Sequence, residues 1–141
     1  MKRHQDRVIV ITGAGRGLGR AYAERLAAEG ARIAVAEIDR AAGTATVEEL
    51  CRTGADALFI ETDVSSKPAA NRMAAAVINK WGYIDGLVAN AALANSVGGR
   101  AYDEISVEEW DRIMQVNVRG TWLTCCAVPT SRPSTAELFC R

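Results

Sequence analysis

The sequence predicts an α/β fold, a parallel sheet covered by helices. Short runs of apolar and β-branched residues alternate with longer segments of helical periodicity, and glycines or turn residues separate the two. The length of 141 residues suits one domain. Hydrophobic residues make up 49% of the chain and aromatic residues 6%, which favours a close-packed interior of Ala, Val and Gly.

Composition argues against several classes of function. The 17 basic and 17 acidic residues balance to zero net charge, so nucleic acid and anionic membranes are not expected partners. No apolar run approaches the roughly 18–20 residues of a membrane span, and no signal peptide is recognised, so a cytoplasmic protein is expected. The four cysteines form no C-x-x-C pair and His4 is the single histidine, so no metal site is expected. Cys125 and Cys126 are expected to be buried as small apolar residues.

The first strand is expected at residues 7–12, a β-branched run that stops at a glycine. A glycine-rich turn follows it at residues 13–17. Leu18, Tyr22 and Leu26 then recur every four residues, which predicts a helix that buries these side chains and ends at Gly30.

The next elements follow the same alternation. Strands are expected at 31–37 and 57–60, with a helix at 41–53 between them. A helix opens at 65–68 and ends at Gly82, and a fourth strand lies within 84–92. The inward residues of that helix are expected to be Ala70, Met73, Val77 and Trp81.

A capping box predicts the start of the last helix. Ser106 and Glu109 have the S-x-x-E spacing that satisfies free N–H groups at a helix start, after a loop at 93–105. The apolar stripe of the helix is predicted at Trp110, Ile113 or Met114, Asn117, Thr121, Cys125 and Val128.

Residues 1–126 are expected to form the domain, and residues 127–141 are expected to be an irregular tail.

The glycine turn is a candidate phosphate cradle. A helix N-terminus offers free N–H groups and partial positive charge, and glycines let a pyrophosphate approach the backbone closely. The pattern is Thr12-Gly13-x-x-x-Gly17-x-Gly19, which matches neither G-x-G-x-x-G nor a P-loop.

That pattern resembles the short-chain dehydrogenase/reductase family. Asp63-Val64 is similar to the family's adenine-contacting pair, and 89–92 resembles its N-N-A-G motif, altered here to Ala-Asn-Ala-Ala. Residues 110–121 resemble its fifth helix, and the resemblance spans about 6–126. It implies a Rossmann-type doubly wound sheet, here incomplete with about four strands, and hydride transfer between a nicotinamide and an alcohol or carbonyl substrate. The cofactor site implied comprises Thr12, Gly13, Arg16, Gly17, Leu18, Gly19, Glu37, Ile38, Asp63, Val64, Asn90, Ala91 and Ala92.

Glu37, at the end of the second strand, favours NAD over NADP. Its carboxylate is expected to accept both ribose hydroxyls and to repel a 2′-phosphate. Arg16 and Arg40 favour NADP instead, and are given less weight. The simpler alternatives are a solvated strand end for Glu37, a helix cap for Asp63, and turn residues for Arg16 and Asn90.

Asn117 is the one candidate catalytic residue. In the resembled family an Asn at this position helps to order a water in the proton relay, whereas the simpler reading is a core amide bonded to backbone. The family's Tyr and Lys occur as Y-x-x-x-K, but the residues four beyond the three tyrosines are Leu26, Leu87 and Ser106. The catalytic Ser, Tyr and Lys are therefore expected to be absent.

Three explanations of this absence are open. The chain is a truncated product, a non-catalytic nucleotide-binding or interaction protein, or an enzyme whose site another chain completes. The patternless tail favours truncation. The fourth strand would then be an open sheet edge, which predicts a homo-oligomer or an aggregation-prone chain.

An S-adenosylmethionine-dependent methyltransferase is the remote alternative. The glycine turn, Glu37 and Asp63 would also suit that cofactor, but Ile11 stands where an acid is usual. The motifs around Asn90 and Asn117 have no place in such an enzyme.

Overall fold

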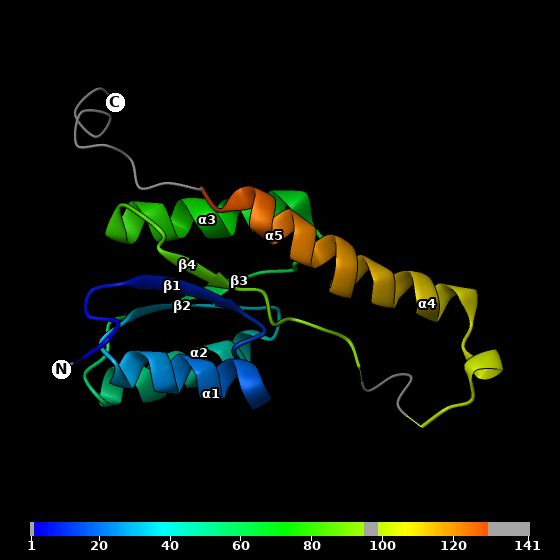
Figure 1. The fold of residues 1–141 in the computed structure, drawn as a ribbon, viewed down its shortest axis with the longest axis horizontal. Helices are drawn as coiled ribbons and strands as arrows, with labels where there is room; N and C mark the ends of the chain where they lie inside the picture. The colour runs from blue at the N-terminus through cyan, green and yellow to red at the C-terminus, as the bar shows by residue number, and fades with distance from the viewer. Residues whose placement is uncertain (1, 95–98, 130–141) are drawn as a thin grey trace.

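The computed structural model describes residues 2–94 and 99–129, and within them four parallel strands form one sheet in the order β3-β2-β1-β4 (Figure 1). This confirms the predicted α/β class. The strands are β1 (Val8–Thr12), β2 (Arg32–Glu37), β3 (Ala57–Glu61) and β4 (Gly86–Val88).

Helices cover both faces of the sheet. Figure 1 shows α1 and α2 on one face and α3 and α5 on the other. A continuous helical rod ends in α5 and begins in α4, which projects beyond the sheet. The bounds are α1 (Gly17–Ala28), α2 (Arg40–Arg52), α3 (Lys67–Trp81), the 3-10 turn η1 (Tyr102–Glu104), α4 (Val107–Met114), the π-helical turn η2 (Gln115–Gly120) and α5 (Thr121–Ala127).

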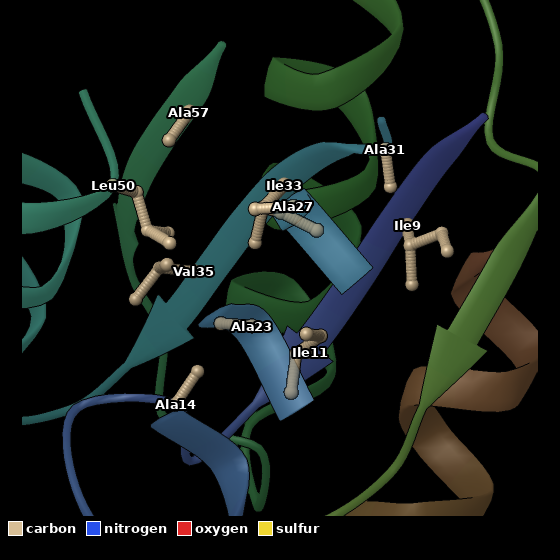
Figure 2. Packing of buried hydrophobic residues seen from close by; sticks show 10 residues of the cluster. All are labelled: Ile9, Ile11, Ala14, Ala23, Ala27, Ala31, Ile33, Val35, Leu50 and Ala57. Atoms are coloured by element: carbon tan, nitrogen blue, oxygen red, sulfur yellow. The ribbon is translucent and has the colours of Figure 1, made fainter. Parts of the chain in front are cut away.

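Alternate side chains of the strands build two separate cores. Ile9, Ile11, Ile33 and Val35 point toward α1 and α2 (Figure 2). Their neighbours on the same strands, such as Val10, pack instead with residues of α3. A strand buried on both faces needs a continuous apolar run, which is why β1 and β2 have polar residues only at their ends.

Helix α3 matches its prediction. Ala70, Met73, Val77 and Trp81 are all buried. Ser66 caps the helix start by accepting the Ala69 N–H, and the helix ends at Gly82, whose φ of 85° is left-handed.

The predicted apolar face of α1 is wrong for two of its three residues, and the third, Leu26, is half-buried against the core. Leu18 and Tyr22 are 68% and 42% exposed, and the buried face is Gly19, Ala23 and Ala27. Small residues face the sheet because α1 lies close to it, and the larger side chains of Leu18 and Tyr22 project outward. The spacing of four residues predicts the helix correctly but does not locate the centre of its buried face.

The predicted stripe of the last helix is only partly correct. Ile113, Asn117, Thr121 and Val128 are half-buried, but Trp110, Met114 and Cys125 are exposed, while Leu123 and Thr124 are buried. The π-helical turn η2 adds a residue to one turn, so a straight 3.6-residue period loses phase there.

The cysteines differ from expectation as well. Cys125 and Cys126 are exposed thiols, as is Cys51. Cys140 lies outside the described residues, as do part of the predicted 93–105 loop and most of the predicted tail.

The capping box at the start of α4 is confirmed. Ser106 accepts the Glu109 N–H, and the Glu109 carboxylate accepts the Ser106 N–H. The Ser106 backbone N–H and then the Arg100 guanidinium hold the pKa of Glu109 below its usual value.

Strand β4 lies at an edge of the sheet. It pairs with β1, and the described part of the chain supplies no strand on its other side. Its three residues are half-buried. Within residues 2–94 and 99–129 no helix has both the length and the apolar character to cross a membrane.

Candidate nucleotide-binding site

The site lies where β1 and β4 end. The chain moves outward from β1 to β2 and β3, and then returns by α3 to place β4 on the other side of β1. The connections leave β1 and β4 in opposite directions, so their carboxyl ends border a crevice. In open α/β sheets ligands bind at such a switch point.

The glycine turn fits there because two glycines allow backbone to pack on backbone. Gly13 has a left-handed φ of 66°, and its N–H donates to the Ala36 carbonyl at 2.8 Å. A Cβ on Gly19 would overlap the Gly13 carbonyl oxygen and stand 2.6 Å from Nδ2 of Asn90. The start of α1 therefore approaches the end of β1 more closely than any other residue type would permit.

Thr12 and Asn90 clamp the ends of β1 and β4 together. The Thr12 hydroxyl accepts the N–H groups of Asn90 and Ala91, each at 3.0 Å. The Asn90 amide donates to the carbonyls of Thr12 and Gly13 at 3.0 and 3.2 Å. Both were predicted as cofactor-binding residues, and their polar atoms are engaged in holding the turn.

Glu37 is buried behind the same turn, with only 7% of its surface exposed. Oε2 accepts the Gly15 N–H at 3.0 Å, and Oε1 accepts the N–H groups of Ile38 and Asp39 at 2.9 and 3.1 Å. A carboxylate has about four acceptor positions, so one remains on Oε2. Glu37 is thus no solvated strand end.

The N-terminus of α1 differs from those of the following helices. Its N-cap residue, Arg16, makes no side-chain capping bond. At the next position Gly17 has open space where a Cβ would stand. The three helices that follow are each capped by a side chain, from Asp39, Ser66 and Ser106.

The two arginines near Glu37 are both paired with carboxylates. Arg16 contacts Asp39 at 3.0 Å, and Arg40 contacts Glu61. The Arg40 guanidinium also lies 5.9 Å from the centre of the Phe59 ring.

Asp63 and Val64 follow β3 at the same edge of the sheet. The exposed Asp63 carboxylate accepts both the N–H and the hydroxyl of Ser65, at 2.9 and 2.7 Å. The N-cap of α3 itself is Ser66, and Asp63 holds the turn at Ser65 just before it, so the capping alternative for Asp63 is correct for the Ser65 region but not for the helix end. Val64 is buried against Gly120, where a Cβ would stand 2.7 Å from its Cγ2.

Asn117 lies inside η2 and holds the segment that follows β4. Its Oδ1 accepts the Leu93 N–H at 2.8 Å, and its Nδ2 donates to the Leu93 carbonyl at 3.0 Å. These bonds match the simpler of the two interpretations of Asn117, a core amide bonded to backbone. It positions the chain leaving the site.

The remaining predicted residues lie at the rim. Ala91 is half-buried, and Leu18, Ile38 and Ala92 are exposed. Leu18 and Ile38 are large apolar side chains at the carboxyl edge, 68% and 63% exposed.

A hollow of about 780 Å³ lies at the opposite, amino edge of the sheet. Its walls include Gln5, Glu24, Gly30 and Gly54, which flank the starts of the strands. None of the described residues that line it belongs to the glycine-rich turn, and in open α/β sheets ligands bind at the other, carboxyl edge. Among the described residues no cluster of three or more potential metal ligands occurs.

Sequence reasoning missed three features of this site. They are the bond from Gly15 to Glu37, the pairing of Arg16 with Asp39, and the π-helical turn around Asn117. A weak signal existed for the second, since Arg16 and Asp39 begin consecutive helices at the same sheet edge.

This sheet and this glycine turn define a Rossmann-type α/β protein. Residues 7–132 match the profile of the family described as short chain dehydrogenase. The chain belongs to the short chain dehydrogenase family.

Relatives and solved structures agree with the family. A sorbitol dehydrogenase of Cereibacter sphaeroides is 40% identical over 126 residues, which cover 89% of this chain and 47% of the relative. A short chain dehydrogenase/reductase of Burkholderia phymatum, solved in complex with NAD, has a TM-score of 0.83 and 33% identity, covering 90% of this chain and 44% of that one. A 3-ketoacyl-(acyl-carrier-protein) reductase of Brucella melitensis, complexed with NADH, has a TM-score of 0.80 and 32% identity, covering 86% and 48%. The chain thus spans about half the length of the relatives it matches.

Proposed function

We propose that this chain binds the adenosine and pyrophosphate part of NAD(H) at the carboxyl ends of β1, β2 and β3. The observation that carries the proposal is the uncapped N-terminus of α1 at the switch point. An anionic pyrophosphate would accept its free N–H groups and gain from the helix dipole. Short chain dehydrogenases bind nicotinamide cofactors, and two structural neighbours were solved with NAD or NADH.

The residues present fit such a ligand. Gly17 leaves open space beside the helix start, while Gly13 and Gly19 bring the backbone within reach. Leu18 and Ile38 would cover the apolar faces of the nucleotide, which accounts for their exposure in the chain alone. The exposed Asp63 carboxylate and the backbone of Val64, whose side chain is buried, would meet the adenine ring.

Glu37 supports NAD as the preferred nucleotide. The vacant acceptor position on Oε2 would take one ribose hydroxyl, fewer than the two expected from the sequence. A 2′-phosphate would instead meet a buried negative charge, which is a repulsive element of selectivity.

A calorimetric titration tests the proposal. We expect NAD and ADP-ribose to bind saturably with similar affinity, because the groups that hold them lie in the adenosine half. S-adenosylmethionine should give no saturable heat. The proposal would be contradicted if S-adenosylmethionine bound as tightly as NAD, or if neither NAD nor ADP-ribose bound.

Hydride transfer between a nicotinamide and an alcohol or carbonyl substrate is the activity proposed for a protein with this family's pattern. The bound nicotinamide would donate the hydride to a carbonyl or accept it from an alcohol. Asn117 would contribute by fixing the backbone at Leu93, which leads out of the site. The 141 residues hold no Y-x-x-x-K to move the proton, so we expect no turnover by this chain alone.

A homodimer through the outer face of the α4–η2–α5 rod is proposed as well. This face carries an apolar stripe of Val107, Trp110, Met114, Val118 and Trp122, with Trp110 57% and Trp122 62% exposed. The spacing of the stripe is nearly the same when read from either end. Two antiparallel copies centred on Met114 would therefore match Trp110 to Val118 and Val107 to Trp122.

Charge also favours a second copy as the occupant of this stripe. Asp111 precedes Met114 and Arg119 follows it, and both are exposed beside the stripe. The same two-fold pairing places Asp111 of each copy two residues, about 3 Å along the helix axis, from the position opposite Arg119 of the other. An isologous interface requires this kind of self-complementarity.

Trp110→Glu tests the dimer. We expect the wild-type chain to sediment as a dimer and the variant as a monomer, because two glutamates would be buried against apolar side chains. Tyr102→Glu is the matched control, since Tyr102 is 90% exposed in η1 and lies off the stripe. A monomeric wild-type chain, or equal effects of both variants, would contradict the proposed interface.

A further inference from the structure

The selectivity for NAD involves an ion pair as well as the carboxylate at the end of β2. Arg16 stands beside Gly15 in the glycine turn, and Asp39 begins α2. Their side chains meet at 3.0 Å. Gly15 and Asp39 also donate backbone N–H groups to Glu37 from its two sides, so the ion pair spans the outside of that buried carboxylate.

Arg16 is the cation best placed to bind a 2′-phosphate. Its side chain is 75% exposed and belongs to the turn that would hold the pyrophosphate. Arg40 is held on two sides, by Glu61 and by the Phe59 ring. A phosphate on the ribose would need a guanidinium with free donors, because charge-assisted bidentate contacts supply most of its recognition.

We propose that Asp39 is a positioning residue for cofactor selectivity: it holds the Arg16 guanidinium and so withholds it from the 2′-phosphate of NADP. This inference rests on the proposed nucleotide site and adds to it a second determinant beside Glu37. Glu37 repels the phosphate directly, and Asp39 occupies the cation that would otherwise offset that repulsion.

Asp39 has a second role that the test must preserve. Its Oδ1 accepts the Ala42 N–H at 3.1 Å and caps α2, while Oδ2 pairs with Arg16. Asparagine is as good an N-cap as aspartate, because its amide oxygen accepts the same bond. Asp39→Asn therefore removes the charge that holds Arg16 and keeps the cap.

Calorimetric dissociation constants for NADH and NADPH are the measurement. In Asp39→Asn we expect NADPH to bind roughly fivefold to tenfold more tightly, since the freed guanidinium is exposed and its new contact is partly screened. NADH affinity should stay within about twofold, because its ribose carries no charge for Arg16 to bind. The melting temperature of the variant should match that of the wild type.

Two further variants separate this explanation from a general change of charge. Adding Arg16→Ala to Asp39→Asn should remove the gain in NADPH affinity. Glu49→Gln also deletes one carboxylate and releases Arg52, but at the amino edge of the sheet, and should leave both affinities unchanged.

An unchanged NADPH affinity in Asp39→Asn, with NADH binding intact, would overturn the role of Asp39 and leave the proposed site standing. A gain that survives Arg16→Ala, or that Glu49→Gln reproduces, would overturn it equally. If the wild-type chain bound neither NADH nor NADPH, the proposed function and this inference would be overturned together.

Discussion

Replacing Gly19 by alanine is expected to abolish nucleotide binding and to lower the free energy of unfolding by about 2–3 kcal/mol. The added methyl group would overlap the Gly13 carbonyl oxygen and stand 2.8 Å from the Gly13 carbonyl carbon. These are backbone atoms at the end of β1, so no side-chain rotation relieves the contact. The helix start must move away from the strand, and the phosphate cradle opens.

Gly86→Ala is the matched control for Gly19→Ala. A Cβ on Gly86 in β4 would meet Ile9 at 3.9 Å, an ordinary contact. We expect its unfolding free energy to change by less than about 0.5 kcal/mol and its nucleotide affinity to persist. Urea denaturation and calorimetry check both variants, and a Gly19→Ala protein that binds NAD like the wild type would show that the cradle is not used.

Glu37→Ala is expected to cost about 2–3 kcal/mol of stability, because it removes the acceptor of three backbone N–H groups. The Gly15 N–H is buried and has no other hydrogen-bond acceptor among the described residues, so losing the bond to Glu37 carries most of the penalty. The N–H groups of Ile38 and Asp39 lie nearer the surface, where water replaces the carboxylate. NADH binding should weaken as well, since the turn loses its support from behind.

Two further variants separate the effect of Glu37 on stability from its effect on nucleotide selectivity. Glu37→Gln retains an acceptor oxygen and removes the charge, so we expect most of the stability to return and the preference for NADH over NADPH to shrink. Glu48→Ala removes an exposed carboxylate from α2 and should change neither quantity. If Glu37→Ala melts like Glu48→Ala, the buried carboxylate does not support the turn.

The fold could be predicted from the sequence because strands buried on both faces leave an unmistakable pattern. Val8 to Ile11 are almost uniformly apolar and β-branched, and each helix that follows is ended or preceded by glycine or a capping side chain. The glycine turn could also be predicted from the sequence. The backbone conformation at Gly13 and the close contact at Gly19 require glycine, so the turn leaves a fixed glycine spacing in the sequence.

The inward faces of two helices could not be predicted in the same way. Periodicity finds a helix but gives no sign of which neighbour it packs against. In α1 the close approach to the sheet selects Ala23 and Ala27 over Leu18 and Tyr22. In the last helix the π-helical turn shifts the phase of the helical repeat, and the sequence from Gln115 to Gly120 does not predict that turn.

The site residues were recognised as a set, but their individual bonds were not. Thr12, Asn90 and Asn117 use their side chains on neighbouring backbone. Such partners come from segments far apart in the chain, and a spacing motif carries no information about them. The pairing of Arg16 with Asp39 has the same origin.

Amide hydrogen exchange with and without saturating NAD tests most directly whether the carboxyl edge of the sheet is the nucleotide site. We predict slower exchange on NAD addition at residues 13–19 and 37–39, where the free N–H groups of α1 and the Glu37 loop lie. Residues 53–56, beside the hollow at the amino edge, should exchange unchanged. Protection confined to residues 53–56, or no protection at 13–19 at a saturating concentration of NAD, would contradict the assignment.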